Sequence, residues 1–179
     1  TLKEHGVNYI RVRVWNDPYD ESGNPYGGGN NDVQTAIIIG KRAAEQGMKV
    51  CVNFHYSDFW ADPSKQMVPK AWAGMDLDEK ACALYEFTKD ALSAMIAAGV
   101  DIGIVQIGNE TTTGMCGERA WVNIAKLMSA GSRAVREVGR EFGKEIMIAI
   151  HFTNPERGLA EYHRFGTLLE SYKVDYDIF

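Results

Sequence analysis

Cysteine is scarce in this sequence, with three residues among 179. Cys51, Cys82 and Cys116 are odd in number and lack the spacing of metal ligands, so the sequence implies neither a disulfide framework nor a metal site. Cys51 and Cys82 lie in apolar stretches, and we predict that both are buried thiols. Cys116 lies in a glycine-flanked loop where nucleophilic catalysis is conceivable, but no local motif supports that role.

Basic clusters and long apolar runs are also missing. A formal net charge of −5 without a concentrated basic patch argues against nucleic acid and anionic membranes as partners. No apolar run is long enough to span a bilayer, and no signal peptide is recognisable at Thr1. The first residues resemble the end of a helix closed by Gly6, so we expect the chain to start inside a longer domain.

A regular alternation of strand and helix patterns fills the chain. Residues 7–15, 48–55, 102–110 and 145–152 are predicted strands, and a fifth strand is predicted over 174–179. Helical spacing occupies 32–46, 78–98 and 118–142, and a further helix is expected to open at Pro155. Long loops rich in turn residues cover 16–31 and 56–75. With 45% hydrophobic residues, the chain can bury one sizeable core.

This alternation predicts an α/β fold with a parallel sheet, for which two closures are possible. An open doubly wound sheet usually has a glycine-rich phosphate turn directly after its first strand, and Gly27–Gly28–Gly29 does not follow a strand in that way. A (β/α)8 TIM barrel instead collects polar side chains at the carboxyl ends of its strands. We therefore predict a barrel. Since a barrel needs about 250 residues, residues 1–179 are expected to be a partial one, lacking the first strand and the last two.

Polar and aromatic side chains stand at the carboxyl ends of four predicted strands. The aliphatic face of each strand is expected to pack against helices and the polar face to point toward the barrel axis. The residues at these ends are Arg13, Trp15, His55, Asn109, Glu110 and His151. Converging on one mouth, such groups suit a neutral, polyhydroxylated ligand. In the loop after the second of these strands, Trp60 and Trp72 can lie against a sugar ring, while Asp58 can bond its hydroxyls together with His55 and Asn109.

Glu110 is the candidate proton donor, because a carboxylate at the end of a buried strand is costly unless it is paired or used. It can protonate a leaving oxygen if burial or a second carboxylate raises its pKa. Glycoside hydrolysis needs two carboxylates. Asp175 and Asp177 lie at the wrong end of the barrel, so the second one is expected from a strand beyond Phe179.

Each of these assignments has an alternative. Glu110 can be a solvated residue that caps the next segment, and Arg11 and Arg13 can form a structural ion-pair layer. His55 and His151 can bind a metal with Asp58, although their spacing matches no metal motif. Trp121 lies on a helix face and is expected in the core, whereas Trp15 fits either the core or the site.

The motifs of this sequence resemble those of glycoside hydrolase family 53, the endo-β-1,4-galactanases that cut type I arabinogalactan. The resemblance is carried by Arg11-Val-Arg-Val-Trp-Asn-Asp-Pro18, Gly27-Gly-Gly-Asn-Asn-Asp32, Asn53-Phe-His-Tyr-Ser-Asp-Phe-Trp-Ala-Asp-Pro63, Pro69-Lys-Ala-Trp72 and Gln106-Ile-Gly-Asn-Glu110. It implies barrel strands two to six, with Glu110 as acid/base, Asn109 on the 2-hydroxyl of the reacting sugar, and Arg13 supporting the nucleophile.

The same resemblance implies a strand-seven glutamate nucleophile that this sequence does not contain. The fragment alone is therefore expected to be inactive. It further implies a secreted, monomeric enzyme that degrades the β-1,4-galactan of pectin, with no cofactor or metal in these residues and with calcium, in some bacterial members, bound near strand eight. The alternatives are a non-catalytic carbohydrate-binding fragment, and a related retaining glycosidase acting on mannan or cellulose.

Overall fold

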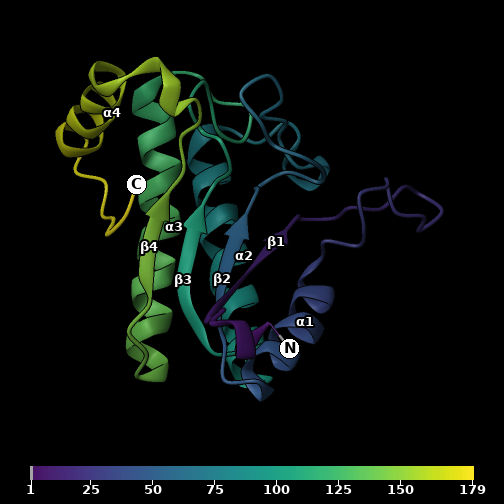
Figure 1. The fold of residues 1–179 in the computed structure, drawn as a ribbon. Coiled ribbons are helices and arrows are strands. Elements are labelled where there is room, and N and C mark those ends of the chain that lie inside the picture. Colours follow the sequence, from purple (N-terminus) through teal and green to yellow (C-terminus); the bar gives the residue numbers. More distant parts are fainter. Residues whose placement is uncertain (1) are drawn as a thin grey trace.

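The computed structural model describes residues 2–179, apart from the side chain of Pro155. Four parallel strands form one sheet in the order β1-β2-β3-β4 (Figure 1). They are β1 (Tyr9–Val14), β2 (Lys49–Phe54), β3 (Ile102–Ile107) and β4 (Met147–Ile150). The α/β class and the parallel sheet are therefore confirmed. The predicted helix end at residues 1–5 is seen as a 3-10 turn, η1 (Lys3–His5); Thr1 lies outside the described residues.

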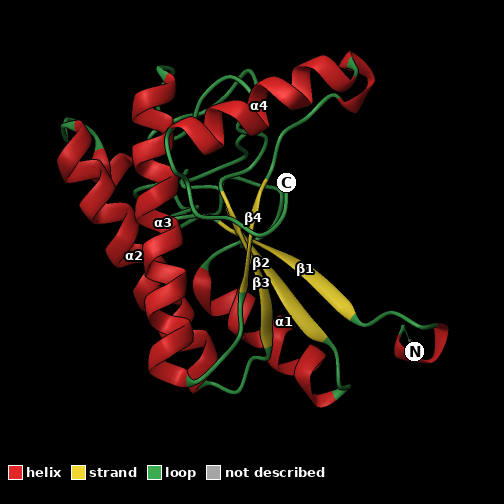
Figure 2. Cartoon of the chain, turned by 90° about the vertical axis from the view of Figure 1, so that its left-hand side faces the viewer, coloured by secondary structure: helices red, strands yellow, loops and turns green. Residues whose placement is uncertain are grey.

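One helix follows each strand, and α2 and α3 lie on the same side of the sheet (Figure 2). The helices are α1 (Val33–Glu45), α2 (Leu77–Ala97), α3 (Trp121–Phe142) and α4 (Leu159–Ser171), with short 3-10 turns η2 (Lys70–Trp72) and η3 (Pro155–Arg157). Asp32 caps the amino end of α1, since its carboxylate accepts the Thr35 N–H at 2.6 Å. None of the described helices is both long enough and apolar enough to cross a membrane.

The core fills the space between the sheet and the helices. Val12, Val52, Val105 and Ile148 of the four strands are all buried on this side. The residues between them, such as Asn53 and Gln106, point to the opposite face and bond to one another there. The predicted division into an aliphatic and a polar face is therefore confirmed, because side chains alternate along a strand.

The fifth strand predicted over 174–179 is represented, in the part of the chain that the structure describes, only by one paired residue, Ile178. Its only sheet pairing among the described residues is a single parallel bridge between Ala149 and Ile178. The Ile150 N–H donates to Ile178 O at 2.9 Å, so the segment follows the edge of β4 without forming a ladder. The Asp177 carboxylate accepts the Ile148 N–H at 2.7 Å and thereby occupies a donor that a ladder would use.

Two smaller predictions need correction. Cys82 is exposed, because the buried stripe of α2 runs through Ala81, Leu84 and Leu92 and leaves position 82 beside it. Cys51 is partly exposed on the polar face of β2. The helix expected from Pro155 begins at Leu159, after the 3-10 turn η3.

Candidate functional site

A cavity of about 470 Å³ lies at the carboxyl ends of the strands. It is lined by Arg11, Arg13, His55, Trp60, Gln106, Asn109, Glu110 and His151, which come from all four strands or from the loops directly after them. Six of the predicted site residues are thus brought together in one place, namely Arg13, His55, Trp60, Asn109, Glu110 and His151. The carboxyl ends of parallel strands share one edge, and this is why residues so far apart in sequence meet here.

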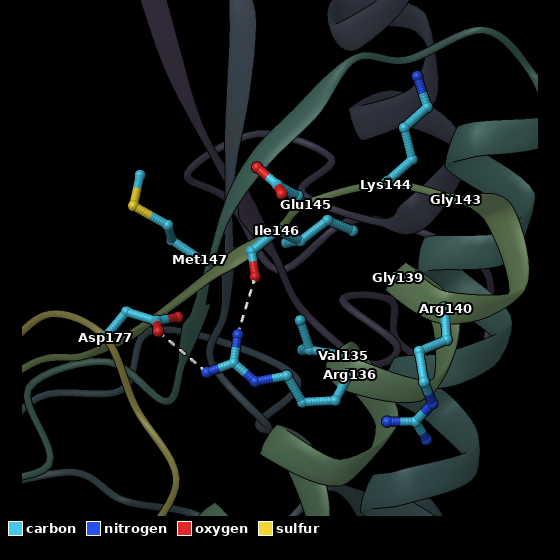
Figure 3. Close-up of a pocket in the computed structure, with 10 residues that line it drawn as sticks. All are labelled: Val135, Arg136, Gly139, Arg140, Gly143, Lys144, Glu145, Ile146, Met147 and Asp177. Carbon is cyan, nitrogen blue, oxygen red and sulfur yellow. Dashed lines mark hydrogen bonds and ion pairs between the residues drawn. The ribbon is translucent and has the colours of Figure 1, made fainter.

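Another cavity, of about 430 Å³, lies at the amino end of β4 (Figure 3). The guanidinium of Arg136 in this cavity donates to the carboxylates of Asp175 and Asp177 and to the carbonyl of Ile146. The two aspartates therefore stand at the amino end of the sheet, as expected, and hold α3 to the segment that follows α4. The groups around this cavity thus have a structural role.

Glu110 follows the end of β3 and faces the first cavity, where it is partly buried. Burial raises the pKa of its carboxyl, and the negative charge of Asp62 adds to the increase, while Arg11 opposes it. Burial and the neighbouring carboxylate of Asp62 thus both act in the direction that a proton donor needs. The alternative of a capping residue fails, because the next helix begins at Trp121 with Ala120 at its N-cap.

Asn109 is buried beside Glu110, and both polar atoms of its amide are engaged. Its Oδ1 accepts from Arg11 Nη2 at 3.0 Å and from Asn53 Nδ2 at 3.2 Å, and its Nδ2 donates to Ala61 O at 2.7 Å. Since an amide nitrogen carries two protons, one N–H of Asn109 is not used by these bonds.

Arg11, Asn53 and Gln106 form a layer beneath this amide that we did not predict as part of the site. Arg11 donates to Gln106 Oε1 at 2.9 and 3.1 Å, and Gln106 Nε2 donates to Asn53 Oδ1 at 2.7 Å. These three residues could have been predicted from the sequence, because each lies on the polar face of its strand shortly before the strand ends. Because Arg11 bonds to neutral amides, it is not part of an ion-pair layer.

The two histidines are both held in the neutral form. His55 is buried, its Nδ1 accepts the Ala61 N–H at 3.1 Å, and burial together with Arg11 and Arg13 lowers its pKa to about 3. His151 Nδ1 accepts the Glu110 N–H at 3.1 Å, and burial followed by Arg11 lowers its pKa as well. A neutral imidazole whose Nδ1 is occupied can offer a ligand only its Nε2. This applies to His151, because the Nε2 of His55 already lies 3.1 Å from Asn53 Nδ2.

Trp60 provides the aromatic surface of the cavity. The Arg13 guanidinium lies 4.4 Å from the centre of its ring, and 37% of the residue is exposed. Trp15 is fully buried and packs edge-on against Trp60 with ring centres 5.6 Å apart, so Trp15 supports the platform from inside. Gly28, in the loop after β1, approaches so closely that a Cβ there would lie 3.1 Å from Trp60 Nε1.

Two predicted ligand-binding residues lie elsewhere. Trp72 is 7% exposed and packs edge-on against Phe87 of α2, so it belongs to the core and its predicted contact with a sugar is wrong. Asp58 does not line the cavity; its carboxylate accepts the backbone N–H groups of Asp17 and Lys70 and so joins the first two loops.

The positions of Cys116 and Trp121 decide two further alternatives. Burial raises the pKa of the Cys116 thiol to about 12, which makes it a poor nucleophile. Trp121 packs against Phe152 and Phe165, as expected for a core residue. Within residues 2–179, no group of three or more His, Cys, Asp or Glu side chains is arranged to hold a metal ion.

Comparison with known proteins relates this geometry to a family. The chain is 58% identical to an endo-β-1,4-galactanase of Bacillus subtilis over 179 residues, which cover all of this chain and 41% of that protein. It is 35% identical to an arabinogalactan endo-β-1,4-galactanase of Cellvibrio japonicus, covering 98% of this chain and 46% of that protein. The chain thus spans less than half the length of these relatives.

Solved structures give the same relationship. The catalytic domain of a family 53 glycoside hydrolase from Ignisphaera aggregans superposes with a TM-score of 0.92 at 41% identity, covering 99% of this chain and 49% of that one. A fungal β-1,4-galactanase superposes with a TM-score of 0.80 at 32% identity, covering 96% of this chain and 49% of that one. The predicted fold class, a (β/α)8 barrel represented here in part, is confirmed by these neighbours. The model of glycosyl hydrolase family 53 matches residues 1–179, and the chain belongs to that family.

Proposed function

We propose that this chain is part of a retaining endo-β-1,4-galactanase in which Glu110 is the acid/base. The observation that carries the proposal is the position of Glu110: it follows β3, faces the cavity beside Asn109, and has a raised pKa. A carboxyl that stays protonated at higher pH can donate its proton to a departing glycosidic oxygen. The galactanases of Bacillus subtilis and Cellvibrio japonicus, to which the chain is similar, support β-1,4-galactan as the substrate.

The other half of the reaction lies outside these residues. A retaining glycosidase places its nucleophile roughly 5–5.5 Å from the acid, and no residue of the cavity lining other than Glu110 is a carboxylate. We propose that residues 1–179 are a partial catalytic domain that lacks the first barrel strand and the last two, and that the nucleophile comes from a later strand. The fragment alone is then inactive, consistent with its covering less than half of its relatives.

The remaining cavity residues are proposed to bind the sugar chain. Trp60 supplies a flat apolar surface for a ring, and the free N–H of Asn109 can donate to a hydroxyl oxygen. Arg13 and His151 offer further polar contacts. His55 lines the cavity beside them, with its two ring nitrogens in contact with Ala61 and Asn53. As the chain is similar to enzymes that cleave arabinogalactan, we propose a secreted, monomeric protein that degrades the galactan side chains of pectin.

The test is Glu110→Gln in the complete enzyme. General acid–base catalysis is worth about 10²- to 10⁴-fold, and galactan hydrolysis should fall by that order. Glu145→Gln, which changes an exposed glutamate just before β4, is the matched control and should keep full activity. Hydrolysis at the wild-type rate by the Glu110 variant would eliminate the assignment.

Two further assays separate the alternatives. Calorimetry of residues 1–179 with galactan oligosaccharides tests whether the fragment binds sugar without turning it over. A reducing-sugar assay of the complete enzyme on galactan, mannan and cellulose tests the substrate, since the pocket's shape sets the identity of the sugar.

A further inference from the structure

The backbone of Glu110 is in the left-handed region, with φ at +52°. Gly108 two residues earlier is also left-handed, but glycine adopts that conformation freely. For a residue with a Cβ it costs about 1–2 kcal/mol, and it persists only where the surroundings hold it. The turn that carries the candidate acid is therefore imposed by its contacts.

The side-chain amide of Gln66 makes two of these contacts. Its Nε2 lies 2.8 Å from Asn109 O and 3.2 Å from Glu110 O, so one group bonds both carbonyls of the Asn-Glu pair. Gln66 comes from the loop between β2 and α2 and is 7% exposed. It does not line the cavity.

Gln66 is itself anchored on two sides. Its Nε2 also lies 3.2 Å from Asp62 O, and its backbone carbonyl accepts the Gly117 N–H at 2.6 Å. On the far side of the turn, the Glu110 N–H donates to His151 Nδ1 at 3.1 Å. The peptide groups on both sides of the Glu110 Cα are thus held by side chains from two other parts of the chain.

We propose that Gln66 is a positioning residue for catalysis, which aims the carboxyl of Glu110 by fixing the carbonyls of Asn109 and Glu110. The inference rests on the proposed function, because it gives Glu110 the role of acid/base. In that role the carboxyl proton passes to the glycosidic oxygen while the bond from C1 to that oxygen breaks, its electron pair stays on the oxygen, and the nucleophile bonds to C1. Rotation of either peptide group would move the carboxyl away from that oxygen.

The test compares two substrates with Gln66→Met in the complete enzyme. Methionine keeps the approximate length and volume of the side chain and removes its N–H donors. A misplacement of about 1 Å can cost roughly 100-fold, so kcat/KM on galactan should fall roughly 10- to 100-fold. A dinitrophenyl β-galactobioside has a leaving group that departs without a proton, so its kcat/KM should change by less than roughly threefold.

The ratio of the two values of kcat/KM is the decisive readout, because it does not depend on how much of the variant is folded. Gln66→Glu is the second variant; its carboxylate cannot donate to the two carbonyls, and the same selective loss is expected. Ser132→Ala is the control for the loss of a buried hydrogen bond, since Ser132 is buried in α3, donates to Met128 O and does not line the cavity. It should leave the ratio unchanged.

Glu110→Ala, measured in parallel, separates the two levels of the proposal. If Glu110→Ala shows the selective loss on galactan and the Gln66 variants do not, the positioning role is overturned and the acid assignment stands. Equal losses on both substrates in the Gln66 variants would likewise reduce Gln66 to a structural residue. If Glu110→Ala itself shows no selectivity, the acid assignment fails, and the role of Gln66 fails with it.

Discussion

Arg11 and Arg13 stand two residues apart on the same face of β1, and their contacts predict unequal roles. Arg11 makes three hydrogen bonds to two amide oxygens, Gln106 Oε1 and Asn109 Oδ1. Arg13 stacks on the exposed ring of Trp60. Replacing each by methionine removes the charge and keeps much of the aliphatic stem. The two variants therefore differ only in the contacts that are lost, and each serves as the control for the other.

The magnitudes follow from what each change leaves behind. A hydrogen bond to a charged group is worth about 1.5–3 kcal/mol, and Arg11→Met removes the one that holds Asn109 while leaving Gln106 Oε1 without its donor. At about 1.4 kcal/mol per tenfold, kcat/KM on galactan should fall roughly 10- to 100-fold. Arg13→Met loses a partly exposed cation–π contact of about 0.5–1 kcal/mol, equivalent to roughly two- to fivefold.

The assay is galactan hydrolysis by the complete enzyme, with melting temperatures measured for both variants. Arg11→Met should also lower the melting temperature, because it leaves a buried amide oxygen unpaired, whereas Arg13→Met should change it little. The resemblance to the family suggested Arg13 as the arginine that supports the nucleophile. A larger loss of activity in Arg13→Met than in Arg11→Met would refute the reasoning from hydrogen bonds and support that suggestion.

Three further predictions concern the surroundings of the site. Asp62→Asn should move the alkaline limb of the pH–activity profile to lower pH, because removal of the negative charge lowers the pKa of Glu110. The loop around Asp62 should keep its conformation, since the three hydrogen bonds that the side chain accepts from Ser64 and Lys65 all go to Oδ1, which asparagine keeps. An unchanged limb would exclude Asp62 as a cause of the raised pKa. Trp60→Ala should raise KM by roughly 5- to 30-fold through the loss of about 1–2 kcal/mol of ring contact, with little change in the melting temperature. Trp72→Ala should instead destabilise the fold by about 3–5 kcal/mol, because Trp72 is buried in the core; a KM effect from Trp72 without loss of stability would restore its predicted contact with the sugar.

The sequence predicted correctly those features that depend on the alternation of side chains along a strand. Alternation along β1 and β2 predicted which side chains face the helices, and the strand ends predicted the place of His55, Glu110 and His151. A polar residue at the carboxyl end of a parallel strand has only one edge of the sheet to occupy, so the site followed from the fold class.

Loop residues were harder to place, because a loop has no period that relates sequence to direction. Trp60 and Trp72 lie in the same loop and are the same residue type, yet one faces the cavity and the other the core. Gln66 was missed for the same reason, since its bonds join it to residues more than 40 positions away. The segment over 174–179 has the composition of a strand, but it makes only one bridge to its neighbour.

The guanidinium of Arg11 determines which atoms of the neighbouring amides donate hydrogen bonds and which accept them. A guanidinium can only donate, so Gln106 must turn its Oε1 toward Arg11 and its Nε2 toward Asn53. Asn53 Oδ1 is then the acceptor, and its Nδ2 is left to donate to Asn109 Oδ1. With its oxygen occupied by Arg11 and Asn53, the Asn109 amide can offer a ligand only an N–H. The ligand atom at that position must therefore be an acceptor, such as the oxygen of a sugar hydroxyl, and a ligand group that can only donate is excluded there.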